Sequence, residues 1–247
     1  MRRSVEMRIA RAGFCCLNRA FDAEPVVAYG TSEMMRVWLE KRLMDCAVVV
    51  CEEADTVIAT DGELVQSIGA RLTGIVKTSP VPRIIRHIET KGGVVLDKAT
   101  ARIDQVEGVK QAFDLGLKRV AVSVAGFQAK AISEIKRLES RLNMDVLIFS
   151  VYNTCVTTME VKHIGKADIA CVCASTILRN KIGSKAVLQV GVTIPVYAFT
   201  EKGKTFILAY LAEFDCKLVA FRTGKLPICL KAKDRDSRVA WTESSPC

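Results

Sequence analysis

The chain has 247 residues, of which 50% are hydrophobic and 26% charged, so it can bury a sizeable core and is not mainly disordered. Its two histidines exclude a metal centre built from several histidine ligands. The net charge of +9 is accompanied by only 6% aromatic residues, whereas nucleic-acid binding favours a basic stripe interleaved with aromatics, so nucleic acid is not the expected partner.

The sequence also indicates the cellular compartment of the protein. The longest apolar runs, such as CAVVVC at 46–51, are far shorter than the roughly 18 to 20 residues that cross a bilayer, so no membrane span is expected. The arginine-rich start of the chain lacks the continuous apolar segment of an export signal. We therefore expect a cytoplasmic protein whose ten cysteines are reduced thiols.

Residues 1–42 are predicted to form an N-terminal arm and a helix. The helix covers 31–43, with Thr31 or Ser32 placed to accept the first free backbone amides. From Leu43 onward, short β-branched runs alternate with amphipathic stretches of helical period. That alternation predicts an α/β fold, with a mainly parallel sheet flanked by helices.

The predicted strands share a high content of β-branched and apolar residues. They cover 46–51, 56–60, 74–78, 94–96, 119–125, 145–151, 168–173 and 194–200. The predicted helices share an apolar stripe at helical spacing. They cover 62–71, 82–91, 104–116, 128–142, 158–165 and 176–183.

The end of this region is predicted to be antiparallel. EKGK at 201–204 is typical of a hairpin turn, and TFILAYL after it is expected to form a last antiparallel strand. The α/β domain therefore spans 43–212, with two similar halves near 43–118 and 119–212 as an option. Residues 213–247 have no sustained period, which predicts a flexible basic tail.

Several strings of this chain resemble one family when they are taken together. They are VVVCEEADTVIATDGELVQSIG, GIVKTSPVPRIIRHIE, LDKATARIDQVEGVKQAFDLGLKRVAVSV and CASTILRNKIGSKAVLQVGVTIPVYAFTEKGK. The chain resembles methanogenesis marker protein 8, an archaeal family of unestablished activity, over about residues 30–210. The resemblance implies a role in methane-producing archaea, as an accessory protein that supports maturation or activation of methyl-coenzyme M reductase.

Two cysteines close predicted strands, where ligands of parallel sheets usually bind. Cys51 ends AVVVC, and Cys173 ends IACVC just before a predicted helix. A helix N-terminus lowers the pKa of a nearby thiol, which gives Cys173 a route to reactivity. Because both residues lie at strand ends, both are candidate catalytic residues. The alternative is that they pack as small hydrophobes, which is the reading we favour for Cys46 and Cys171. Cys171 and Cys173 are two apart, so on a strand both side chains share a face.

A second set of residues is suited to hold a ligand. Thr78 and Ser79 offer hydroxyls ahead of a predicted helix, although the prolines around them also explain the turn. Gly126 permits close backbone approach after a predicted strand. Ser175 and Arg179 follow Cys173, and a guanidinium there could bind a carboxylate or phosphate or simply face solvent.

The remaining ionisable residues are more readily explained by structure. Asp104 and Glu107 match a helix N-cap with its acidic partner, and Asp61 is placed to cap likewise. His87 and His163 lack a neighbouring catalytic motif and are expected at the surface. With no C-x-x-C motif, a metal site confined to one loop is unsupported, and no cofactor is identified.

Two classes of function remain open. The first is the accessory protein of methanogenesis, which would bind methyl-coenzyme M reductase, its activation factors or a cofactor. The second is a thiol-dependent enzyme or a small-ligand sensor that uses the strand-end cysteines. A homo-oligomer is compatible with either.

Overall fold

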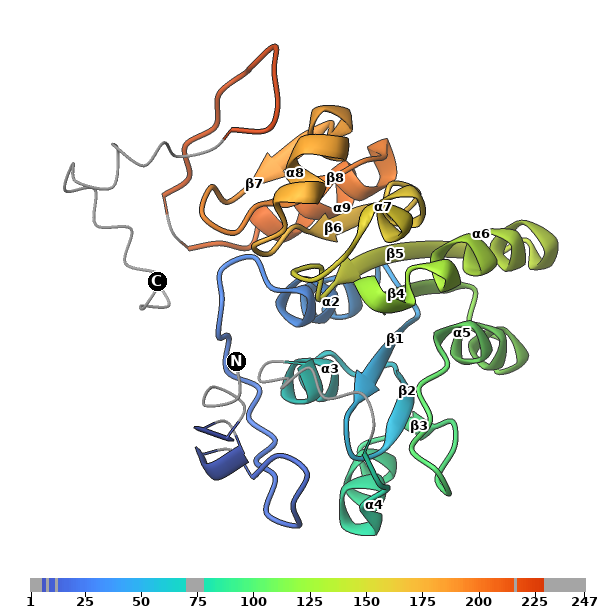
Figure 1. The fold of residues 1–247 in the computed structure, drawn as a ribbon. Coiled ribbons are helices and arrows are strands. Elements are labelled where there is room, and N and C mark those ends of the chain that lie inside the picture. The colour runs from blue at the N-terminus through green and yellow to red at the C-terminus, as the bar shows by residue number, and fades with distance from the viewer. Residues whose placement is uncertain (1–5, 8, 12, 70–77, 216, 229–247) are drawn as a thin grey trace. The chain divides into compact units, whose positions relative to one another are not determined.

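A computed structural model describes residues 6–7, 9–11, 13–69, 78–215 and 217–228 (Figure 1). The chain forms two compact units. The first comprises Met1–Val26, Gly30–Ser123 and Glu134–Val146. The second comprises Val27–Tyr29, Val124–Ser133 and Leu147–Cys247. No described helix has both the length and the apolar character needed to span a membrane.

The strands confirm the predicted α/β class. They follow the order β3-β2-β1-β4-β5-β6-β8-β7 in an eight-stranded sheet. The pairs β1–β4 and β5–β6 are parallel. The pairs at the two ends of this order are antiparallel. The sheet is therefore parallel toward its middle, and helices flank it as the periodicity predicted.

The first unit is built on a buried hairpin. β1 (Cys46–Cys51) pairs antiparallel with β2 (Asp55–Ala59), and both are almost fully buried, as expected for runs rich in valine and isoleucine. β3 (Val94–Val95) pairs with β2, and β4 (Arg119–Ala125) pairs with β1. β4 continues into the second unit from Val124.

The first unit also contains helices. They are α2 (Thr31–Glu40), α3 (Gly62–Gly69), α4 (Pro82–Thr90), α5 (Gln105–Asp114) and most of α6 (Lys130–Leu142). α3 and α5 contact β1, and α2 contacts α3 (Figure 1). The fully buried Trp38 of α2 is among the largest side chains of this core.

Two predictions about helix starts have different outcomes. Asp104 caps α5 by accepting the amide of Glu107 at 3.0 Å, as predicted. α2 is not capped by Thr31 or Ser32, because Gly30 is its N-cap residue and no side chain caps it. The helix begins one residue earlier than the capping pattern requires, so the Ser32 hydroxyl donates to Glu33 instead, at 3.0 Å.

The second unit contains the remaining strands and several helical segments. The strands are β5 (Asp145–Val151, whose first two residues belong to the first unit), β6 (Ile169–Cys171), β7 (Leu188–Val190) and β8 (Val196–Ala198). The helical segments are η1 (Gly126–Gln128), α7 (Thr158–Ile164), α8 (Thr176–Ile182), η2 (Gly183–Lys185) and α9 (Glu201–Leu211). β7 was not predicted.

The predicted hairpin turn at 201–204 is wrong. These residues begin α9, and the antiparallel C-terminal hairpin is formed by β7 and β8 instead. The Thr200 hydroxyl caps α9 by accepting the amide of Gly203 at 3.0 Å. A Cβ at Gly203 would lie 2.4 Å from the carbonyl oxygen of Asp168, so this glycine serves close helix packing and not a turn.

Some predictions fall outside the described residues. The strand predicted at 74–78 lies there except for Thr78, as do the last two residues of the helix predicted at 62–71. The flexible tail predicted over 213–247 is described only in part. The two similar halves near 43–118 and 119–212 stay a prediction.

The turn between β1 and β2 buries three carboxyl groups, those of Glu52, Glu53 and Asp55. Glu53 forms an ion pair with the buried guanidinium of Arg19 and accepts the amide of Cys15 at 2.7 Å. Asp55 has a φ of 119° and accepts the amide of Thr56 through one oxygen. Its other oxygen is buried without a hydrogen-bond partner among the described residues. Burial raises the pKa of Asp55 from 3.8 to about 6.

This shift predicts how stability depends on pH. Because the folded-state pKa of Asp55 is raised, the folded protein retains a proton that the unfolded chain releases between about pH 4 and pH 6. The contribution of Asp55 to stability is therefore lost as the pH rises through this window. We expect Asp55→Asn, which stays neutral, to flatten that fall and to raise the urea midpoint at pH 7. Urea unfolding from pH 4 to 7 measures both effects, with the exposed Asp114→Asn as control. Parallel profiles for wild type and Asp55→Asn would contradict this prediction.

Candidate functional site

The residues singled out from the sequence are divided between the two units. Cys51, Thr78 and Ser79 belong to the first unit. The second unit contains Gly126, Cys173, Ser175 and Arg179. Each group is described in its own unit.

Cys51 lies in the core of the first unit. Its side chain is 0% exposed, and its thiol donates to the carboxylate of Glu53 at 3.4 Å. Burial raises the pKa of Cys51 to about 12. Cys51 is buried because it pairs directly with Asp55 in the β1–β2 hairpin, so a tight turn closes the end of β1. The exposed strand-end thiol expected at Cys51 is therefore absent, and a protonated, buried sulfur is a poor nucleophile.

Thr78 and Ser79 lie before α4. The hydroxyl of Thr78 donates to the carbonyl of Glu52, and the amide of Val81 donates to the carbonyl of Glu53 at 2.8 Å. These bonds attach the segment to the β1–β2 turn. Val81 is the N-cap residue of α4 and Pro82 follows it, so proline begins this helix without a side-chain cap. Ser79 remains exposed.

In the second unit, two sulfur atoms lie in contact at the end of β6. The Sγ atoms of Cys171 and Cys173 are 3.6 Å apart, and both residues are half-buried. Cys173 has a φ of 52°, in the left-handed region that few residues other than glycine adopt. Residues two apart on a regular strand are separated by roughly 6.6 Å along it, so this turn is what brings the side chains together.

Hydrogen bonds make Cys173 the ionised member of this pair. The Cys171 thiol, the amide of Asn153, the hydroxyl of Thr154 and the amide of Tyr152 all stabilise its thiolate. Together they outweigh burial and lower the pKa of Cys173 from 9.0 to about 6. Because Cys171 donates its proton to Cys173 and is itself desolvated, its pKa is raised well above 9.0. The pair therefore holds one proton and one negative charge at neutral pH.

The donors come from the loop that follows β5. Tyr152 also has a φ of 52°, and successive amides in such a turn form an anion-binding concavity. The buried side chain of Asn153 fastens this loop to β6, because its Nδ2 donates to the carbonyl of Cys171 at 2.7 Å. The same nitrogen donates to the carbonyl of Ser150 at 3.2 Å, and the hydroxyl of Ser150 donates to the Asn153 side-chain oxygen at 3.1 Å. The concavity is therefore fixed in place by a buried amide.

Gly126 and Ser175 support this arrangement. A Cβ at Gly126 would lie 2.4 Å from Oδ1 of Asn153, so only glycine leaves room for that side chain. Ser175 caps α8 by accepting the amide of Leu178 at 3.3 Å. Apart from the Cys171 thiol, the donors that lower the pKa of Cys173 thus come from the β5 loop, whereas the sequence pointed to the helix after Cys173.

Arg179 lies on α8. Its Nη2 donates to the carbonyl of Thr193 at 3.0 Å, in the connection between β7 and β8. Its Nε is buried and has no hydrogen-bond partner among the described residues.

Tyr152, Asn153 and Thr154 were not identified from the sequence, and Cys171 was expected to pack as a core thiol. The available signal was weak: polar residues directly after a predicted strand, and the shared face of a C-x-C pair. Neither signal shows that the β5 loop reaches the sulfur of Cys173, because the contact joins residues about twenty positions apart in the chain.

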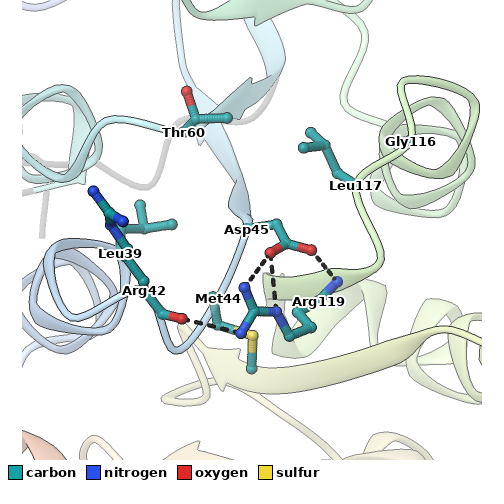
Figure 2. Close-up of a pocket in the computed structure, with 8 residues that line it drawn as sticks. All are labelled: Leu39, Arg42, Met44, Asp45, Thr60, Gly116, Leu117 and Arg119. Carbon is teal, nitrogen blue, oxygen red and sulfur yellow. Dashed lines mark hydrogen bonds and ion pairs between the residues drawn. The ribbon is translucent and has the colours of Figure 1, made fainter.

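A metal cluster and a hollow in the first unit are the two alternatives to the dithiol. In the described part of the chain, no three histidine, cysteine or acidic side chains are grouped to hold a metal ion. A hollow of about 550 Å³ in the first unit is lined by Asp45, Arg119 and six further residues (Figure 2). There Arg119 donates to Asp45 at 2.9 Å and to the carbonyl of Arg42 at 3.0 Å. Asp45 and Arg119 lie at the amino ends of β1 and β4, whereas ligands of parallel sheets bind at the carboxyl ends. The two side chains also pair with each other, so neither charge in this hollow is left for a ligand.

The lowered pKa predicts the reactivity of Cys173. We expect its alkylation by iodoacetamide to rise with pH to a midpoint near pH 6, because the thiolate is the reactive form. Thr154→Val removes one donor and should move the midpoint upward. Peptide mass spectrometry after timed labelling measures the rate at Cys173, and Cys173→Ser defines the background. Alkylation of Cys173 that rises only above pH 8 would refute the assignment.

The comparison with known proteins gives a family. Residues 1–212 match the family model described as "Uncharacterized protein conserved in archaea (DUF2099)". The chain is also 35% identical over 232 residues to "Uncharacterized protein MJ0054" of Methanocaldococcus jannaschii, covering 92% of this chain and 79% of that relative. The match extends over most of both units and includes the Cys171–Cys173 segment. The chain therefore belongs to this archaeal family of conserved, uncharacterised proteins.

Proposed function

We propose that the protein carries out thiol–disulfide exchange, with Cys173 as the nucleophile and Cys171 as the resolving thiol. The observation that carries the proposal is the 3.6 Å contact between a stabilised thiolate and a protonated partner. A thiol attacks disulfides best when its pKa lies near the ambient pH, because both ionisation and nucleophilicity are then adequate. Cys173, with a pKa of about 6, meets this condition.

The exchange proceeds in two displacements. The Cys173 thiolate attacks one sulfur of a substrate disulfide, whose S–S bond breaks, and the departing thiolate takes up a proton. Cys171 then loses its proton and attacks the Cys173 sulfur, which releases the second substrate thiol. The protein is left with a Cys171–Cys173 disulfide and has given two electrons to the substrate. An external dithiol reductant, by the same exchange in reverse, returns the pair to its starting state.

The geometry favours the second displacement. An S–S bond is about 2.05 Å long, so the two sulfur atoms must approach by roughly 1.5 Å from their present contact. Side-chain rotation at two half-buried residues supplies movements of this size. When Cys173 becomes neutral in the mixed disulfide, the donors of Tyr152, Asn153 and Thr154 lose their anion, and this frees its sulfur to move toward Cys171.

Trapping of the intermediate tests this proposal. The experiment uses a background in which the exposed Cys16 and Cys155 and the C-terminal Cys216, Cys229 and Cys247 are replaced by serine. One equivalent of dithiodipyridine should release two thiopyridones from the parent and leave no adduct. Cys171→Ser should release one and retain a thiopyridyl adduct on Cys173. Cys173→Ser should release little. An adduct that persists on the parent would show that Cys171 does not resolve it.

A second candidate function is an accessory role in methanogenesis. It is supported by the resemblance to methanogenesis marker protein 8 and by the relative in the methanogen M. jannaschii. In this role the protein would support maturation or activation of methyl-coenzyme M reductase through protein or cofactor binding. The two candidates are compatible, since a thiol exchange site can serve a maturation step.

Affinity capture tests the accessory role. The tagged full chain, expressed in a methanogen and purified without oxygen, should recover reductase subunits or their activation factors. The Cys171→Ser variant should increase that recovery if a mixed disulfide holds the partner, because the complex is not resolved. Recovery equal to that of an unrelated tagged protein would count against the accessory role. It would not bear on the exchange function, which the trapping experiment tests separately.

A further inference from the structure

Arg179 is a cation of the second unit with unused hydrogen-bonding capacity. One of its five N–H groups donates to the carbonyl of Thr193. Its Nε is buried and unpartnered among the described residues, and no ion pair joins Arg179 to a carboxylate in that part of the chain. A buried donor without a partner is costly, so native proteins usually satisfy it, and a ligand is one way of doing so.

Hydrogen bonds connect the Arg179 guanidinium to the strand connection that lies beside the dithiol segment. β6 and β8 are antiparallel, with Cys171 opposite Val196, and the amide of Val172 donates to the carbonyl of Pro195 at 2.9 Å. Thr193 lies two residues before Pro195, in the connection that leads into β8. Because Arg179 is hydrogen-bonded to Thr193, its guanidinium is attached to the connection whose Pro195 pairs with Val172, the residue between the two cysteines.

The charges near the dithiol suit an anionic substrate. The Cys173 thiolate already has its own donors from the β5 loop, so it does not need Arg179 for stabilisation. Arginine presents a planar fork of N–H groups that matches the oxygens of a carboxylate or phosphate. A bound anion at this position would satisfy the free donors of Arg179 while a disulfide on the same molecule faced Cys173.

We propose that Arg179 binds an anionic group of the substrate, so that the preferred substrate of Cys173 is a disulfide carrying a carboxylate or phosphate. This inference rests on the proposed exchange function and adds the substrate class. Arg179 is assigned as a specificity-determining residue: it selects the disulfide by charge, and Cys173 carries the chemistry.

Two probe disulfides test the inference on the full chain, in the background with serine at the five cysteines replaced above. Dithiobis(nitrobenzoate) carries carboxylates, and dithiodipyridine is neutral at pH 7. The measured quantity is the ratio of their second-order rate constants at Cys173. Arg179→Gln should lower this ratio about tenfold, the effect expected on losing one charge-assisted contact. Arg179→Lys should lower it less, because the charge is kept.

The control is Lys181→Gln, at an exposed position of the same helix. It changes net charge equally and should leave the ratio unchanged. If Arg179→Gln lowers both rates equally, or neither, Arg179 only holds the β7–β8 connection and the inference is overturned, while the exchange function stands. If Cys173 of the parent reacts slowly with both probes, the proposed function itself fails.

Discussion

The second unit depends on the buried side chain of Asn153. One amide group donates to the carbonyls of Ser150 and Cys171, so it joins the ends of two parallel strands where their ladder stops. The backbone amide of the same residue stabilises the Cys173 thiolate. Gly126 has no side chain because Oδ1 of Asn153 occupies the space that a Cβ would need. A neutral amide thus sets the positions of the charged atoms around it.

The two units stabilise buried negative charge in different ways. In the first, the carboxylate of Glu53 is balanced by the guanidinium of Arg19, whose second nitrogen donates to the carbonyl of Ile68 at 2.8 Å. A buried ion pair of this kind is costly to break, and burial keeps Cys51 protonated beside the carboxylate of Glu53. In the second, the negative charge of Cys173 is stabilised by hydrogen-bond donors without a full positive charge.

Strand ends explain why two similar sequence contexts lead to different chemistry. Cys51 and Cys173 both close a run of small apolar residues. β1 turns at once into an antiparallel partner, so its end is covered. β6 lies parallel to β5, and its chain leaves through a left-handed residue toward α8, so the sulfur is directed to the loop of the neighbouring strand. The tight turn into β2 closes the end of β1, whereas the connection through α8 leaves the carboxyl end of β6 open for a site.

The sequence by itself determined the α/β class, most strands and helices and the Asp104 cap, because hydrophobic period and capping are local properties. It misassigned 201–211, where Gly203 resembled a turn residue but is required by the packing of α9 on the carbonyl of Asp168. Only the tertiary structure decided which strand-end thiol is ionised. Besides the neighbouring Cys171 thiol, the donors to Cys173 come from Tyr152, Asn153 and Thr154, and residues so far apart in the chain meet only when β5 and β6 pair.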